Sequence, residues 1–208
     1  VSDPPDFVLR NDFQTDWQGY SVLNLSPQLS LLSPSKLTSL HDFTALDFDG
    51  VDDYVEVPND PSFHPTTAVS VEVMINPSIK SGYGGLAGAR SYNSYQLFLY
   101  GNTITWDIYN VNGRDIWPSG VIVSDSAWTH IAATYLASTG EMKIYKNGIL
   151  AASRVHAYGA GDIRSSTSNF LIGYSGAGLE YYKGLITEVR VWNVARTQAE
   201  IQADMNRT

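Results

Sequence analysis

The feature that most constrains the fold is an alternation of apolar and other side chains with a period of two, which begins near Phe43. It is clearest in three segments, Val69–Ile75, Ile104–Ile108 and Ile131–Tyr135. A period of two places alternate side chains on opposite faces of a β-strand, whereas a helix repeats about every 3.6 residues. Several short strands of this kind, separated by turn residues, predict an all-β sandwich or jelly roll.

Three local signals refine this prediction. Asn147-Gly148 is typical of a type I′ turn, in which both central residues need a positive φ, and therefore predicts a β-hairpin. Residues 45–57 predict a strand, a turn at Gly50 and a second strand, which we expect to form another hairpin. Thr197-Gln198-Ala199-Glu200 matches a capping box and predicts a short helix near the end of the chain.

Four segments in consistent order resemble laminin-G-like and pentraxin-like jelly rolls of the concanavalin A type. They are Phe48–Val55, Trp128–Tyr135, Ile144–Leu150, and residues 170–173 followed by 184–192. The resemblance implies a concanavalin A-like jelly roll over residues 44–208, with a short C-terminal helix and an N-terminal arm or linker over residues 1–43. It also implies that Trp128 and Trp192 lie in the core and that His130 is a structural histidine.

Composition excludes several classes of function. The chain has no cysteine, so disulfides, thiolate nucleophiles and cysteine-zinc sites are excluded. Its net charge is −8 and it has no basic run, which argues against a nucleic acid partner. No apolar run reaches membrane-spanning length, so we expect no membrane insertion. A surface rich in serine, threonine, asparagine, glycine and tyrosine favours an extracellular location, secreted or at a cell surface.

A catalytic role finds little support in the sequence. Glycoside hydrolases on this fold resemble one another in a Glu-x-Asp-x-Glu strand, which places an acid and a nucleophile on one face. None of the six glutamates has this context, and no Gly-x-Ser-x-Gly motif is present. We therefore expect no enzymatic activity and rank a glycoside hydrolase or lyase as the third interpretation.

Four aspartates within seven residues (Asp47, Asp49, Asp52 and Asp53) suggest a cation site. Calcium binds six to eight oxygen ligands from carboxylates and backbone carbonyls. We predict one structural calcium ion held by Asp49, Gly50 and Asp53, with Glu188 from the closing strand. Many relatives carry Ile-Asp-Glu-Val in that strand, where this chain has Thr187 before Glu188. The alternative is that the aspartates cap backbone N–H groups of the turn.

Aromatic residues interleaved with amides and charges between residues 92 and 117 suggest a ligand site. An exposed ring with polar neighbours suits a sugar, which has apolar C–H faces and a hydroxyl rim. We predict ligand contacts from seven residues: Tyr92, Asn93, Tyr95, Trp106, Tyr109, Arg114 and Trp117. Trp106 aligns with core positions, so burial is the alternative for it, whereas we expect Trp117 to be exposed in an irregular loop. A second loop, Tyr174–Tyr182, would form one wall.

These patterns favour a non-catalytic extracellular recognition module that binds carbohydrate, in the manner of a lectin. The recognised surface could also belong to an extracellular protein. The alternative is a structural or assembly domain, in which the N-terminal arm docks onto a neighbour and the chain forms a homo-oligomer.

Overall fold

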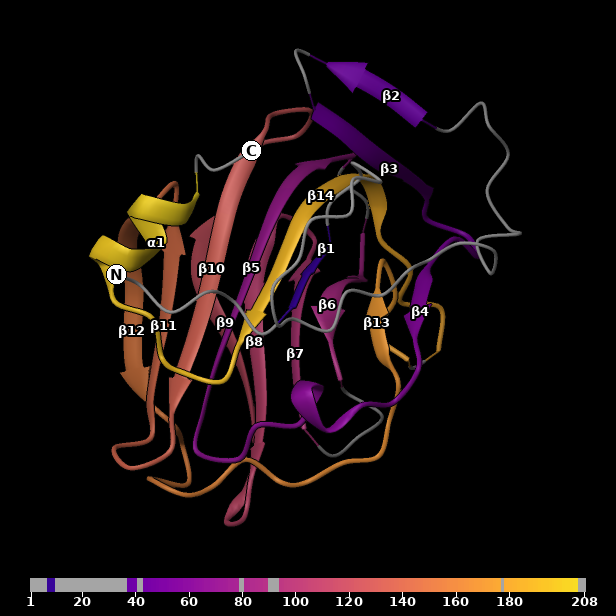
Figure 1. Ribbon diagram of the computed structural model, residues 1–208. Helices are drawn as coiled ribbons and strands as arrows, with labels where there is room; N and C mark the ends of the chain where they lie inside the picture. The colour runs from indigo at the N-terminus through magenta and orange to yellow at the C-terminus, as the bar shows by residue number, and fades with distance from the viewer. Residues whose placement is uncertain are drawn as a thin grey trace, which may run out of the picture.

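A computed structural model describes residues 7–9, 37–40, 43–78, 81–89, 94–176 and 178–205. Within these residues the strands form two antiparallel sheets that face each other (Figure 1). The eight-stranded sheet has the order β12-β11-β10-β5-β14-β3-β2, and β1 also pairs with β14. The six-stranded sheet has the order β4-β13-β6-β7-β8-β9. This arrangement confirms the predicted concanavalin A-like jelly roll.

The strands have the following bounds. In the eight-stranded sheet they are β1 Phe7–Leu9, β2 Leu37–Leu40, β3 Phe43–Asp49, β5 Ala68–Pro77, β10 Thr129–Leu136, β11 Glu141–Lys146, β12 Ile149–Val155 and β14 Lys183–Trp192. In the six-stranded sheet they are β4 Val55–Val57, β6 Tyr83–Gly88, β7 Tyr95–Tyr100, β8 Thr103–Asn110, β9 Gly113–Ile122 and β13 Phe170–Ile172. A 3-10 turn, Pro61–Phe63, precedes β5, and the helix α1 spans Gln198–Asp204.

The core lies between the sheets, and the predicted alternation is confirmed. The apolar residues of Val69–Ile75, Ile104–Ile108 and Ile131–Tyr135 that share a face are buried against the opposite sheet. The Trp106 indole N–H donates to the backbone oxygen of Thr134 across the core at 3.2 Å. Trp128, which the resemblance places in the core, is partly exposed.

The prediction of a hairpin over residues 45–57 is wrong. β3 pairs with β2 and β14 in the eight-stranded sheet, whereas β4 pairs with β13 in the six-stranded sheet. The turn at Gly50, with φ of 78°, therefore carries the chain from one sheet to the other. Strand-turn-strand patterns do not distinguish these two outcomes, because the pairing partners are distant in sequence.

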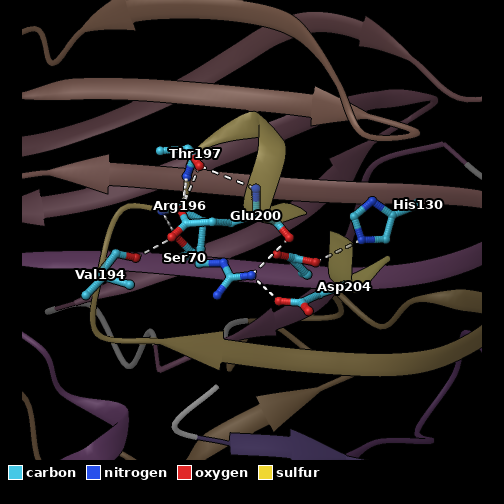
Figure 2. Close-up of polar contacts among 8 residues, drawn as sticks. Ser70, His130, Val194, Arg196, Thr197, Glu200 and Asp204 are labelled. Carbon is cyan, nitrogen blue, oxygen red and sulfur yellow. Dashed lines mark hydrogen bonds and ion pairs between the residues drawn. The ribbon is translucent and has the colours of Figure 1, made fainter. Parts of the chain in front are cut away.

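The helix α1 packs on the outer face of the eight-stranded sheet, where Ile201 contacts Ala132 and Tyr145 (Figure 1). The predicted capping box is confirmed, because the Thr197 and Glu200 side chains each accept a hydrogen bond from the other's backbone N–H. Arg196 anchors the helix through the Asp204 carboxylate (Figure 2).

Two further polar contacts hold this face together. The backbone N–H of Arg196 donates to Ser70 Oγ at 2.9 Å, which joins the start of the helix to β5. Nearby, the Nε2 atom of buried His130 lies 3.1 Å from the Glu72 carboxylate, which supports the prediction of a structural histidine.

The Asn147-Gly148 turn joins β11 to β12 with positive φ at both residues, which confirms the predicted hairpin. Of residues 1–43, only β1 and β2 are described apart from Phe43, and they pair with β14 and β3. No helix in the described part of the chain is long and apolar enough to cross a membrane.

Candidate ligand-binding face

Several polar residues lie on the outer face of the six-stranded sheet, the face that points away from the core. Strand pairing aligns one row of residues across all six strands: Glu56, Leu171, Gly88, Gln96, Asp107 and Ile116. The adjacent row contains Gly85, Phe98, Thr105 and Pro118. These residues alternate with core residues such as Leu97 and Trp106, so their side chains project from the face of the sheet opposite to the core.

The floor of this face contains buried polar atoms without hydrogen-bond partners. Ser94, Gln96 and Thr105 are each at most 1% exposed. Among the described residues, Ser94 Oγ, Gln96 Oε1 and Thr105 Oγ1 have no partner. An unsatisfied buried polar atom costs about 1–3 kcal/mol, and such atoms are rare in native proteins. Three such atoms belong to this face, on Ser94 just before β7, Gln96 on β7 and Thr105 on β8. We therefore take this floor as the candidate site for a hydrogen-bonding molecule.

A charged pair borders this floor. Arg114 on β9 donates to both carboxylate oxygens of Asp107 on β8, with the shortest distance 2.6 Å. The guanidinium also lies 5.0 Å from the centre of the Tyr109 ring. Partial burial disfavours the charged guanidinium, but the hydrogen bond to Asp107 and its charge outweigh this and raise the pKa of Arg114. Arg114 is thus a fixed, charged donor, while its side chain remains 23% exposed.

Aromatic rings stand at the other end of the face. Tyr83 on β6 and Tyr100 on β7 are 37% and 52% exposed, and their ring centres lie 4.7 Å apart. Phe98 is buried beside them, edge-on to Tyr83 at 5.2 Å. The face therefore combines exposed rings with polar groups, the combination that a sugar needs.

Two glycines shape the floor between these ends. A Cβ at Gly88 would lie 2.5 Å from the Tyr95 backbone oxygen and 2.9 Å from Gln96 Oε1. A Cβ at Gly85 would lie less than 3.0 Å from backbone atoms of Tyr174 and Ser175. The loop after β13 thus packs directly on this face at Gly85, as expected for the wall predicted over residues 174–182.

Only part of the predicted ligand set lies on this face. Tyr109 and Arg114 belong to it, and Tyr92 and Asn93 lie outside the described residues. Tyr95 and Trp106 are buried on the core side, at 1% and 0% exposure. The expectation that Trp117 is exposed in a loop is wrong, because it lies in β9, pairs with Trp106 and is 8% exposed.

The floor residues Gln96, Thr105 and Asp107 are missing from the sequence-based ligand set. A signal for them exists, because each lies one position away from an apolar residue of the core face. Polar residues that alternate with the core residues of a strand project from its other face.

The strands of this sheet carry two carboxylates on the outer face, Glu56 and Asp107. They lie four strands apart, which corresponds to about 19 Å at the usual strand spacing. A glycosidase pair lies about 5–9.5 Å apart. These two residues therefore do not form such a pair.

The predicted calcium ligands come together only in part. Carboxylate oxygens of Asp49, Asp52 and Asp53, here called the aspartate cluster, lie within 4.8 Å of one another. Two oxygens cap the turn: Asp49 Oδ1 accepts from the Val51 N–H, and Asp53 Oδ2 accepts from the Asp49 N–H, each at 2.9 Å. An oxygen-only cluster of this kind fits calcium chemically.

Glu188 does not join the aspartate cluster. Asp49 pairs with Lys183, which leaves Glu188 five residues farther along β14, or about 16 Å away along the strand. Glu188 instead forms an ion pair with Arg190.

The comparisons with known proteins agree with this fold. A family profile described as the concanavalin A-like lectin/glucanases superfamily matches residues 49–202. No curated protein matches the chain in sequence. Similar solved structures include domain 4 of an extracellular arabinanase from Geobacillus stearothermophilus, in complex with arabinotriose. It is 18% identical with a TM-score of 0.62, and the match covers 80% of this chain and 79% of that one.

Two more similar structures belong to longer chains. A Bacteroides ovatus protein described as carbohydrate-binding is 22% identical with a TM-score of 0.64. The match covers 79% of this chain and 47% of that chain. The binding domain of Paraclostridial Mosquitocidal Protein 1 is 12% identical with a TM-score of 0.68, and the match covers 82% of this chain and 45% of that one. This chain thus spans about half the length of both structures.

Proposed function

The chain belongs to the concanavalin A-like lectin/glucanases superfamily, and we propose that it is a non-catalytic carbohydrate-binding module that binds glycan on the outer face of the six-stranded sheet. The observation that carries the proposal is the set of three buried, unpartnered oxygens of Ser94, Gln96 and Thr105. The sandwich does not require polar side chains there, and each one destabilises the fold unless it is hydrogen-bonded. Sugar hydroxyls both donate and accept hydrogen bonds.

The ligand rests on the partly exposed rim of this face. Arg114 donates from one side, with Asp107 fixing its orientation, and Tyr109 offers an aromatic surface beside it. The floor oxygens are closed to solvent in this structure, so sugar hydroxyls bond to them, directly or through bridging water, only after the groups that cover the floor move aside. The ligand is a neutral glycan, because Asp107 already compensates the charge of Arg114 and the chain as a whole carries a charge of −8.

Two observations support glycan over other ligands. The face combines exposed tyrosines with amide, hydroxyl and guanidinium groups. The similar arabinanase domain is a structure in complex with arabinotriose, a neutral sugar. We also infer an extracellular location, which the low proportion of charged residues, 16%, favours; fractionation of the source cells tests it.

The test is binding of an oligosaccharide panel by a glycan array and by titration calorimetry, with arabinotriose and sialyllactose as the neutral and anionic probes. Arg114→Met and Thr105→Val should each weaken neutral-sugar binding about tenfold or more, since each removes a hydrogen bond worth about 1–3 kcal/mol in a buried setting. Arg154→Met is the matched control, because it removes a similar ion pair with Asp115 from the other side of β9.

Arg154→Met should leave sugar binding unchanged. Absence of binding to every glycan on the array would overturn the proposal. A discrete oligomer by light scattering, together with a clean array, would favour the assembly alternative.

A further inference from the structure

The loop between β13 and β14 forms a short hairpin on the ligand-binding face. Tyr174 and Tyr181 form a β-bridge, and the Tyr182 N–H donates to the Gly173 oxygen at 2.8 Å. The Gly85 N–H of β6 donates to the Glu180 oxygen at 3.0 Å, which fixes the hairpin to the sheet. We call residues 174–181 the tyrosine hairpin; residue 177 lies outside the described residues.

Three tyrosine rings form a cluster on the hairpin. The rings of Tyr174 and Tyr181 stack with centres 4.3 Å apart and an interplanar angle of 11°. Tyr54, just before β4, lies 5.5 Å and 6.3 Å from them at a tilt of about 50°. Tyr54 is exposed and the stacked pair is partly exposed. The cluster is thus a preformed aromatic surface rather than part of the core.

The chemistry of the cluster suits a sugar ring. Burial, with smaller contributions from Tyr181 and Glu180, raises the pKa of Tyr174, so its hydroxyl remains protonated in neutral solution. A neutral phenol offers an apolar face for stacking and a hydroxyl for hydrogen bonding. Ser175 binds the Glu180 carboxylate, which fixes the polar edge of the hairpin.

The position of the hairpin relative to Arg114 sets the length of the ligand. Arg114 lies on β9 and the hairpin follows β13, four strand spacings away. At the usual spacing this is about 19 Å. The floor residues Gln96 and Thr105 lie on the strands between these two ends but are at most 1% exposed, so a ligand that reaches both ends passes over the groups that cover the floor. A single sugar ring cannot contact both ends, whereas an extended chain of several rings can.

We propose that the face binds an extended stretch of a neutral glycan that crosses the strands, with one sugar unit at Arg114 and another stacked on the tyrosine hairpin. This inference rests on the proposed function and adds the length and direction of the ligand. The aromatic end contributes to affinity only for chains long enough to reach it.

The experiment is titration calorimetry with arabino-oligosaccharides and cello-oligosaccharides, each from the disaccharide to the hexasaccharide. Affinity should rise with chain length and then level off when the face is filled. Tyr181→Ala should weaken hexasaccharide binding about tenfold, the change expected for loss of one aromatic contact, and leave the disaccharide unaffected. Tyr181→Phe keeps the ring and should retain most of the hexasaccharide affinity.

The outcomes separate the two proposals. Equal affinity for the disaccharide and hexasaccharide, with Tyr181→Ala changing neither, would overturn the extended ligand and leave glycan binding intact. Absence of binding by all lengths in both series would overturn both. Near-ultraviolet circular dichroism and the melting temperature of Tyr181→Ala verify that a loss of affinity does not come from unfolding, and Tyr174→Ala provides a second test of the same ring pair.

Discussion

Gly85 is the position at which the sheet and the tyrosine hairpin are most tightly coupled. A Cβ there would meet backbone atoms of Tyr174 and Ser175 at less than 3.0 Å. Because these atoms are backbone, no rotamer change relieves the clash, and either the hairpin or β6 has to move. We predict that Gly85→Ala displaces the tyrosine hairpin from the sheet.

The magnitude follows from three contributions. Overpacking costs about 1–3 kcal/mol. Loss of the hydrogen bond from the Gly85 N–H to the Glu180 oxygen costs a further 0.5–1.5 kcal/mol or so. The lower entropy of the unfolded chain with alanine offsets about 0.4–1 kcal/mol. The net destabilisation is about 0.5–4 kcal/mol, which lowers the melting temperature by about 1–16 °C for a chain of this size.

The assay is thermal and urea unfolding of Gly85→Ala, combined with hexasaccharide titration. Gly101→Asn is the control, since a Cβ at Gly101 meets nothing within 4 Å and asparagine tolerates its φ of 58°. An unchanged melting temperature together with unchanged hexasaccharide binding for Gly85→Ala would refute the close contact between hairpin and sheet. Normal stability with weakened hexasaccharide binding would instead show that the hairpin moves at little cost.

Three further predictions concern the rest of the sandwich. If the aspartate cluster binds calcium, an excess of chelator lowers the melting temperature, and calcium at about 100 times its dissociation constant adds about 2.7 kcal/mol of stability; an equal effect of chelator on Asp53→Asn would argue against it. His130→Leu should destabilise the fold by about 3–5 kcal/mol, because buried Glu72 loses its partner, and Glu72→Met in the same chain should recover most of this in urea unfolding. The backbone hydrogen bond from Thr197 lowers the pKa of Glu200. The charged Glu200 carboxylate therefore stabilises the fold above its unfolded-state pKa, and this contribution is lost as the pH falls through its folded-state pKa. Glu200→Gln should remove this part of the acid dependence of stability.

The sequence predicts the fold well because core faces obey a simple alternation. A strand face that packs against the core needs apolar residues at every second position, and Val69–Ile75 shows this without exception. The hairpin at Asn147-Gly148 follows from backbone geometry at two residues. Pairing between distant strands leaves no such local trace, so the sequence pattern predicts one hairpin for β3 and β4 although they belong to different sheets.

The candidate site is less predictable, because its residues depend on register and on bulges. Pro118 and Gly120 suggest a loop around Trp117, yet β9 continues through them with a register shift between Thr103 and Thr105 of β8. Trp117 lies before that shift and pairs with Trp106, which keeps its ring on the core side. Glu188 is misplaced for a similar reason, since a motif match fixes its strand but not its distance from Asp49.

The strongest reason to assign function to the outer face is that the fold gains nothing from the unpartnered oxygens of Ser94, Gln96 and Thr105. A sheet buried on both sides is more stable with apolar side chains on both faces, since unpartnered polar atoms carry a desolvation cost. Gln96 and Thr105 are buried on the outer face without partners for Oε1 and Oγ1, whereas Phe98, which follows Gln96 by two residues on β7 and pairs with Thr105 of β8, is apolar. Thr105→Val should therefore raise the melting temperature slightly while it weakens glycan binding. A stability gain without loss of glycan binding would show that Thr105 does not contribute to ligand binding.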